Sequence, residues 1–268
     1  MAAHYIPDMK KNIMNLFVST PKVAVIRLTG AIGTGRGAMT DAALAPLIEK
    51  AFAKSKLKAV VLQINSPGGS PTQSALIAAR IRRLAAENEL PVFAFVEDVA
   101  ASGGYWLATA ADEIYADDNS VVGSIGVIAG GFGFHELIKS YGVERRMHTA
   151  GESKSMLDPF QPEKPEDVER LETVLAQIHQ NFIAQVKDRR GEKLIGDDLF
   201  TGEFWVGQKA VDNGLIDGLG HMVPLMKARF GDTVRFRVYG QKKGLFSRFG
   251  ASVLNQIEER RLWARFGL

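Results

Sequence analysis

Ser102 is a candidate nucleophile because its neighbours are small and it stands at a predicted turn. It lies in DVAASGGYWLA (residues 98–108), between the apolar run of residues 92–96 and a helix-like stretch. A hydroxyl between alanine and glycine at a strand-to-helix turn is accessible, and the new helix points its first N–H groups at whatever approaches. A second glycine turn, NSPGG at residues 65–69, follows the strand-like run VVLQI. Two such turns can supply a nucleophile and an oxyanion hole, which indicates acyl-transfer chemistry.

A serine nucleophile needs a base to take its proton, and histidine is the usual partner. The chain has five histidines, none with the small, glycine-rich neighbours of Ser102: His4, His135, His148, His179 and His221. His179 falls within a long amphipathic pattern, and His4 lies near the N-terminus. We interpret them as surface or structural residues, and a histidine base stays open as an alternative.

Lys154 is the other candidate base. It lies among small and apolar residues in TAGESKSMLDPF (residues 149–160), after a predicted strand and before a proline. A lysine accepts a proton only as a neutral amine, which burial favours because desolvation penalises the ammonium form. Pairing with Glu152 or Asp158, the nearest acids, would oppose this. Taken alone, one lysine in such a loop is more typical of a solvated charge.

Four features follow one another along the chain in a specific order. They are the SPGG turn (residues 66–69), SGG (102–104), GSIGVI (123–128) and the Lys154 loop, with Lys154 52 positions after Ser102. From about residue 22 to residue 220, their order and spacing resemble the signal peptide peptidase A family of serine peptidases, which includes SohB-like members. Each motif is weak alone, and the combination is specific.

The resemblance implies a role for five residues. Ser102 matches the nucleophile and Lys154 the general base, while Gly69 and Gly103 match the backbone N–H donors of the oxyanion hole. Ser124 matches a hydroxyl that orients the lysine amine. A glycine at position 69 lets the backbone approach the scissile carbonyl, and the N–H that follows the nucleophile is unpaired at a helix start.

The resemblance also implies a fold and an activity. The fold is α/β of the Clp protease and crotonase type, a superhelix of strand–strand–helix units, followed here by an amphipathic C-terminal extension. The activity is that of a serine endopeptidase that cleaves signal-peptide remnants or unfolded or membrane-derived polypeptides through an acyl-enzyme. No cofactor and no metal are implied. Such subunits form rings or domes around a shared cavity, sometimes with site residues from adjacent subunits.

Two other functions remain as alternatives: a crotonase-type acyl-CoA enzyme, which uses a backbone oxyanion hole without a serine nucleophile, and a catalytically silent oligomeric scaffold. Ser102 is also compatible with a simple helix cap, and NSPGG with an ordinary loop. We interpret Tyr105 and Trp106 as core residues rather than substrate contacts.

The elements that must position these residues alternate along the chain. Patterns predict strands at residues 22–29, 58–65, 91–96, 114–116, 121–127, 142–148 and 233–239, and helices at 40–54, 71–88, 103–110, 165–189 and 208–213. Residues 199–202 and 215–218 complete the core. Repeated strand–glycine turn–helix units predict parallel strands with right-handed crossovers. We divide the chain into an N-terminal segment (1–21), a peptidase domain (22–220) and a C-terminal strand and tail (221–268).

Composition limits the kinds of site and partner that the chain can have. The chain has no cysteine, which excludes disulfides, thiolate metal sites and cysteine nucleophiles. Residues 241–268 carry six basic and two acidic side chains, so the net charge of +3 becomes −1 for residues 1–240. The basic character is therefore confined to the tail, and we expect no nucleic-acid partner.

We expect no segment that spans a membrane, and any membrane contact would be peripheral. No segment reaches the roughly 20 apolar residues that span a bilayer, and the N-terminus lacks a clear signal-peptide pattern. We expect a cytoplasmic protein, with peripheral location at the inner membrane as the alternative. The tail (residues 245–268) has apolar residues among basic ones, which is compatible with a basic amphipathic helix at a membrane surface; we favour packing against a neighbouring subunit or domain.

Overall fold

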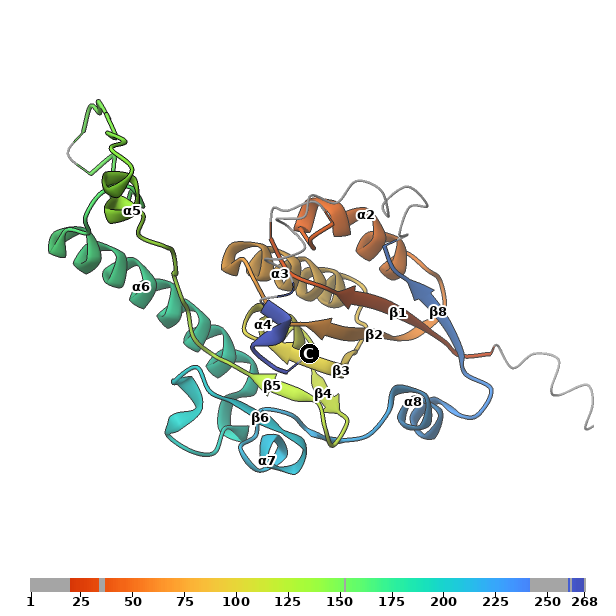
Figure 1. The fold of residues 1–268 in the computed structure, drawn as a ribbon. Helices are drawn as coiled ribbons and strands as arrows, with labels where there is room; N and C mark the ends of the chain where they lie inside the picture. The colour runs from red at the N-terminus through yellow and green to blue at the C-terminus, as the bar shows by residue number, and fades with distance from the viewer. Residues whose placement is uncertain (1–19, 34–36, 152, 242–259, 261, 268) are drawn as a thin grey trace, which may run out of the picture.

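A single mixed sheet forms the centre of the molecule. The computed structural model describes residues 20–33, 37–151, 153–241, 260 and 262–267. Within them the sheet has eight strands, whose main path runs β6-β5-β3-β2-β1-β8, with β4 beside β3 and β7 beside β4 (Figure 1). All pairs are parallel except β5 with β6. The parallel strands predicted from the sequence are confirmed.

The central strands are buried on both faces. They are β1 (Lys22–Thr29), β2 (Leu57–Ser66) and β3 (Val92–Ala101), with β8 (Arg235–Tyr239) at the edge beside β1. Along β1, Ala24, Ile26 and Leu28 face one apolar cluster, and Val23 and Val25 face a second. Side chains of a strand alternate between its faces, so a continuous apolar run fits a strand that is covered on both sides.

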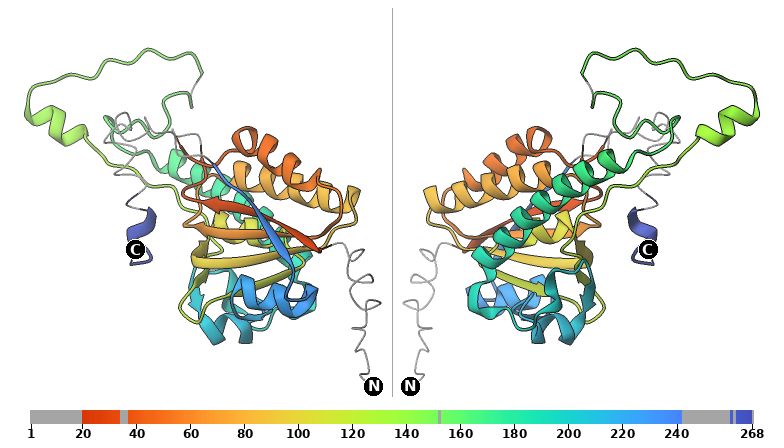
Figure 2. Two further views of the ribbon diagram at one scale, coloured as in Figure 1. Left: turned by 90° about the vertical axis from the view of Figure 1, so that its right-hand side faces the viewer. Right: turned by 90° about the vertical axis from the view of Figure 1, so that its left-hand side faces the viewer.

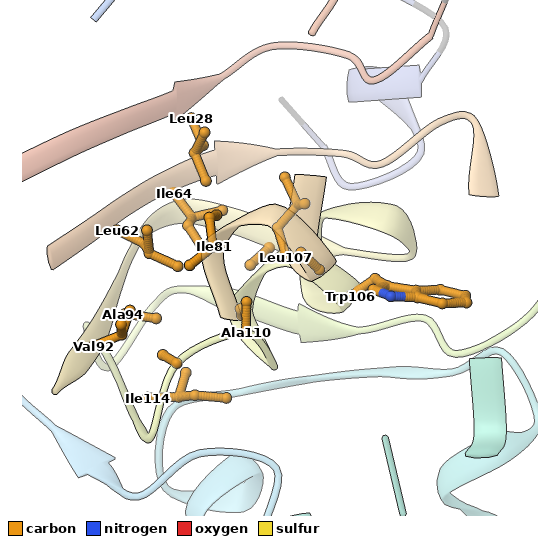
Figure 3. Close-up of a cluster of buried hydrophobic side chains, with 14 of the residues drawn as sticks. Leu28, Leu62, Ile64, Ile81, Val92, Ala94, Trp106, Leu107, Ala110 and Ile114 are labelled. Carbon is orange, nitrogen blue, oxygen red and sulfur yellow. The ribbon is translucent and has the colours of Figure 1, made fainter. Parts of the chain in front are cut away.

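Helices cover the two faces unequally. The larger cluster lies between the sheet and α2 (Asp41–Phe52), α3 (Pro71–Glu87) and α4 (Gly103–Ala108), and Figure 3 shows part of it around Leu62, Ile64 and Leu107. The smaller cluster packs against α8 (Met222–Phe230). Local signals define the helix starts, since the Thr40 hydroxyl accepts from Ala43 N and α3 begins with a proline.

Strand β3 changes partner along its length. Its first half pairs with β4 (Glu113–Ala116), and its last residues, Val99 to Ala101, pair with β5 (Val121–Gly123). The chain then reaches Ser102 directly. The shorter elements nearby are β6 (Phe204–Val206), α7 (Gly207–Asp212), β7 (Gly218–Leu219) and the 3₁₀ turns Gly191–Lys193 and Asp198–Phe200. The change of partner places the Ser102 turn beside the end of β5.

A long excursion, called here the arm (residues 127–164), leaves the body between β5 and α6 (Pro165–Arg190). Figure 2 shows that it projects well beyond the sheet and carries α5 (His135–Ser140) near its outer end. Its two sides are joined by a hydrogen bond from Phe134 N to Pro159 O (2.6 Å) and by the rings of Phe134 and Phe160, whose centroids lie 5.6 Å apart. The arm therefore has internal contacts although it lies away from the main core.

Two sequence predictions are wrong. Residues 142–148 form no strand, because on the exposed arm no neighbouring strand pairs with their backbone groups. The strand predicted to reach residue 127 ends at Gly123, where the chain turns through Ser124. Residues 199–202, which we expected to complete the core, begin within the 3₁₀ turn Asp198–Phe200, where Leu199 is buried. Most of the N-terminal segment and of the tail (residues 1–19, 242–259, 261 and 268) lies outside the described residues. Within those described, no helix has the length and apolarity to cross a bilayer.

Candidate active site

Ser102 occupies a strained turn between β3 and α4. Its backbone has φ 52° and ψ −123°, a conformation that costs a residue with a side chain about 1–3 kcal/mol. Ser102 N donates to Gly123 O (2.8 Å), and Ser102 O accepts from Tyr105 N and Trp106 N. Ser102 stands at the N-cap position, yet its hydroxyl caps no helix N–H among the described residues. The turn is held from both sides while the hydroxyl is left free.

Gly69 and Gly103 bring two backbone N–H groups close together. In the described part of the chain, neither N–H has an acceptor within the protein. A Cβ built on Gly103 would lie 3.3 Å from Gly69 N and 2.4 Å from Ser74 Oγ, and one built on Gly69 would lie 1.8 Å from Ile32 O. Only glycine fits at both positions, and the two free donors can bind one developing oxyanion.

Ser124 lies just beyond β5 on the same pocket. It is 4% exposed and has a positive φ of 51°. Its N–H donates to Glu203 O (2.6 Å), and its carbonyl accepts from Gly126 N (3.0 Å). Within the described residues its hydroxyl makes no hydrogen bond. That leaves a hydroxyl free to bind an amine or a substrate group.

These residues surround one cavity of about 300 Å³. The glycine turn supplies Pro67, Gly69 and Pro71, and the Ser102 turn supplies Gly103 and Trp106. A third wall is the segment from Ser124 to Ile128, and a fourth comes from α6. Four of the five site residues predicted from the sequence thus line a single pocket: Gly69, Ser102, Gly103 and Ser124.

Aromatic residues support the pocket from below. Tyr105 is fully buried, and its hydroxyl donates to Leu215 O (2.7 Å). Burial raises the pKa of this hydroxyl, so Tyr105 remains a neutral core residue, as the sequence predicts. Trp106 is 8% exposed and stacks on Phe182 of α6, with ring centroids 4.9 Å apart. Trp106 and Phe182 also line the cavity, so they serve both core and pocket.

Lys154 is the predicted site residue that lies elsewhere. It is exposed on the arm and does not line the Ser102 pocket. Asp158, one of the acids considered as a competing partner, pairs with Arg145 instead (3.4 Å). Lys154 makes no ion pair with any acid that the structure describes. Within one copy of the chain, the expected burial of Lys154 is absent.

His179 is a pocket residue that sequence reasoning interpreted as surface or structural. It lies on α6 between Ile178 and Phe182, which also line the cavity, and its Nε2 is 3.0 Å from Ile125 O. The signal in the sequence was weak: one polar residue among apolar ones at helical spacing. The described end of the tail also reaches the cavity, through Leu262 and Arg265.

Comparison with known families decides the classification. The sequence model of "Peptidase family S49" matches residues 85–228, which is more than half of the chain. The chain belongs to the peptidase S49 family. The matched region includes the Ser102 turn, Ser124, the arm with Lys154 and the whole of α6.

Relatives of this S49 chain include longer proteins. It is 34% identical to "Protease 4" of Haemophilus influenzae, over 74% of this chain and 33% of that protein. It is 49% identical to a protein of Brucella melitensis biotype 1 named "Na(+)/H(+) antiporter NhaA", over 92% of this chain and 37% of that protein. The chain therefore spans about a third of the length of these curated relatives.

The fold is shared with a solved peptidase. A structure titled as a membrane-bound stomatin-specific protease superposes with a TM-score of 0.52 at 15% identity, covering 85% of this chain and 100% of that one. At this identity the match establishes the fold alone. The α/β fold of the Clp protease and crotonase type expected from the sequence is confirmed.

Proposed function

We propose that this chain hydrolyses peptide bonds through an acyl-enzyme, with Ser102 as nucleophile. The observation that carries the proposal is the free Ser102 hydroxyl, held in a strained turn on one pocket with the free N–H groups of Gly69 and Gly103. Ser102 Oγ attacks the peptide carbonyl carbon, and the carbonyl oxygen takes up negative charge beside the two N–H groups. Collapse releases the amine, and water then cleaves the ester.

We further propose that the base is Lys154 of a neighbouring copy of the chain. It would take the Ser102 proton and pass it to the leaving amine. Two observations support delivery from a neighbour: Lys154 is exposed on the projecting arm, and Ser124 holds an unbound hydroxyl at the pocket. Enclosure between two copies would remove water from the amine and favour its neutral form.

The arm's surface supports association between copies. It exposes large apolar side chains, among them Ile128 (70% exposed) and Tyr141 (79% exposed). Large apolar side chains exposed in this way are typical of an interface in an oligomer. An oligomer with pockets facing a shared cavity would admit extended or unfolded polypeptides and short peptides. The pocket's apolar lining, from Trp106, Ile178 and Phe182, suits apolar substrate side chains such as those of signal-peptide remnants.

Labelling with a fluorophosphonate tests the nucleophile. The purified protein should label with one probe per site, and Ser102→Ala should neither label nor hydrolyse a peptide. Ser140→Ala is the matched control, because Ser140 lies on the arm and its hydroxyl donates to Leu137 O one turn earlier. Labelling that persists in Ser102→Ala would reject Ser102. An acyl-CoA enzyme or a silent scaffold would not label at all.

Mixing inactive subunits tests the shared site. Ser102→Ala and Lys154→Ala should each be inactive alone, and co-expression in equal amounts should restore activity. In a head-to-tail ring, about a quarter of the sites would combine an intact serine with an intact lysine. A dyad within one chain would give no recovery. That outcome would reject the shared site and leave the nucleophile assignment intact.

A further inference from the structure

The hydrogen bond between α6 and the segment beyond β5 assigns a task to His179. Its Nε2 lies 3.0 Å from Ile125 O. A carbonyl oxygen only accepts, so Nε2 carries the proton and donates it. Ile125 is fully buried and stands between Ser124 and Gly126, both of which line the Ser102 pocket. The His179 side chain therefore contacts the backbone of the pocket wall.

In the described part of the chain, few other hydrogen bonds hold that wall. Residues 124–128 lie outside any strand, and Ser124 holds a positive φ of 51°. The bond from Ser124 N to Glu203 O ties one end, and the bond from Gly126 N to Ser124 O is local. A strained residue keeps its conformation only when surrounding contacts enforce it. The buried Ile125 side chain packs in the larger core cluster, and the His179 bond fixes the Ile125 carbonyl to α6 across the pocket.

We propose that His179 is a positioning residue for peptide hydrolysis. By holding Ile125 O, it sets the place of the Ser124 hydroxyl and of the Gly126–Ile128 backbone against which substrate lies. This inference rests on the proposed function, since it concerns the same pocket. His179 does this as an Nε2 donor and needs no change of charge during the reaction.

Two substitutions separate this role from others. His179→Gln keeps an amide N–H near the place of Nε2, and His179→Phe keeps a ring without any donor. A general base would be lost equally in both variants, whereas a donor would be lost only in His179→Phe. Gln177→Ala is the matched control, because Gln177 lies on α6 outside the pocket and its side chain donates to Asn181 Oδ1 (3.3 Å) on the same helix.

The first measurement is steady-state kinetics with a peptide substrate. We expect His179→Phe to lower kcat/KM by about 10–100-fold, mainly through KM, since small displacements of positioning groups have effects of this size. His179→Gln and Gln177→Ala should stay within about threefold of the wild type. Equal losses in both His179 variants, or no loss in either, would overturn the proposal.

The second measurement needs no turnover. In the Ser102→Ala protein, ring ¹⁵N shifts should report the Nε2–H tautomer of His179. When His179→Phe is added, the Gly126 amide should exchange its hydrogen about five- to tenfold faster. When His179→Gln is added, the exchange rate should not change. Unchanged exchange in His179→Phe would overturn the positioning role. If the wild-type protein has no peptidase activity but the variants show this exchange pattern, the proposed function is rejected, while the role of His179 in holding Ile125 O stands.

Discussion

Replacing Gly103 by alanine should separate the stability of the fold from the chemistry of the pocket. The new Cβ would lie 2.4 Å from Ser74 Oγ, which donates to Ser70 O at 2.9 Å. Overpacking of this kind costs about 1–3 kcal/mol, or roughly 2–12 °C in Tm for a chain of this size. The same methyl group would lie 3.3 Å from Gly69 N, beside the proposed oxyanion. Since loss of one donor typically costs 10²–10³-fold, kcat should fall by about that factor.

A second substitution isolates the two effects. Ser74→Ala removes the oxygen that collides, at the cost of one hydrogen bond worth about 1 kcal/mol. The double variant should therefore recover most of the Tm lost by Gly103→Ala but none of the activity, because the methyl group still crowds Gly69 N. Thermal unfolding and peptide hydrolysis should be measured on the wild type, both single variants and the double variant. The data give one double-mutant cycle for Tm and one for activity.

Two results would refute this reasoning. If Gly103→Ala keeps kcat within about threefold of the wild type, Gly69 N and Gly103 N do not bind the reacting oxygen. If the double variant regains activity together with Tm, the loss came from the collision with Ser74 and not from the oxyanion hole.

Three further predictions concern the base, the core and a buried ion pair. Lys154→Arg should abolish peptide hydrolysis without changing the oligomer seen by light scattering, because a guanidinium keeps its proton at working pH; an active variant would reject Lys154 as the base. Trp106→Ala should lower the free energy of unfolding in urea by about 3–5 kcal/mol through loss of the stack on Phe182, and a loss below about 1 kcal/mol would contradict that packing. Burial alone would raise the pKa of Asp217, but hydrogen bonds from Arg190 and Lys193 outweigh it and hold the pKa below its ordinary value. The stability from Asp217 is thus present above a pH of about 4 and lost as the pH falls further. Asp217→Asn should lower Tm at pH 7 by about 6–20 °C and weaken its acid dependence, and a Tm within 2 °C of the wild type would contradict this.

Much of the scaffold follows from local sequence. Largely apolar runs such as residues 22–29 and 58–65 form central strands, because several consecutive buried residues fit a strand that is covered on both faces. Helix starts at Thr40 and Pro71 follow from capping groups within a few residues of each other. The glycine turns at residues 68–69 and 103–104 are visible in the sequence, although the atoms that exclude a Cβ there, such as Ile32 O beside Gly69 and Ser66 O beside Gly104, lie far away along the chain.

Other features depend on what lies across the fold. Residues 142–148 have the composition of a strand but gain no partner, because the arm carries them away from the sheet. His179 belongs to the pocket only because α6 crosses beside Ile125, 54 residues earlier in the chain. Lys154 was predicted from the resemblance, and its place on an exposed arm is a property of the tertiary structure.

One physical cause separates the features that local sequence indicates from those that depend on the tertiary structure. Strand and helix preferences, capping and turn geometry arise from interactions between residues close in sequence, so the amino-acid sequence by itself indicates the central strands, the Ser102 turn and the glycine turn. The meeting of Gly69, Ser102, Gly103 and Ser124 on one pocket requires strands β2, β3 and β5 to lie side by side. That arrangement, and the exclusion of Lys154 from the same copy's pocket, come from long-range packing, which local interactions do not specify.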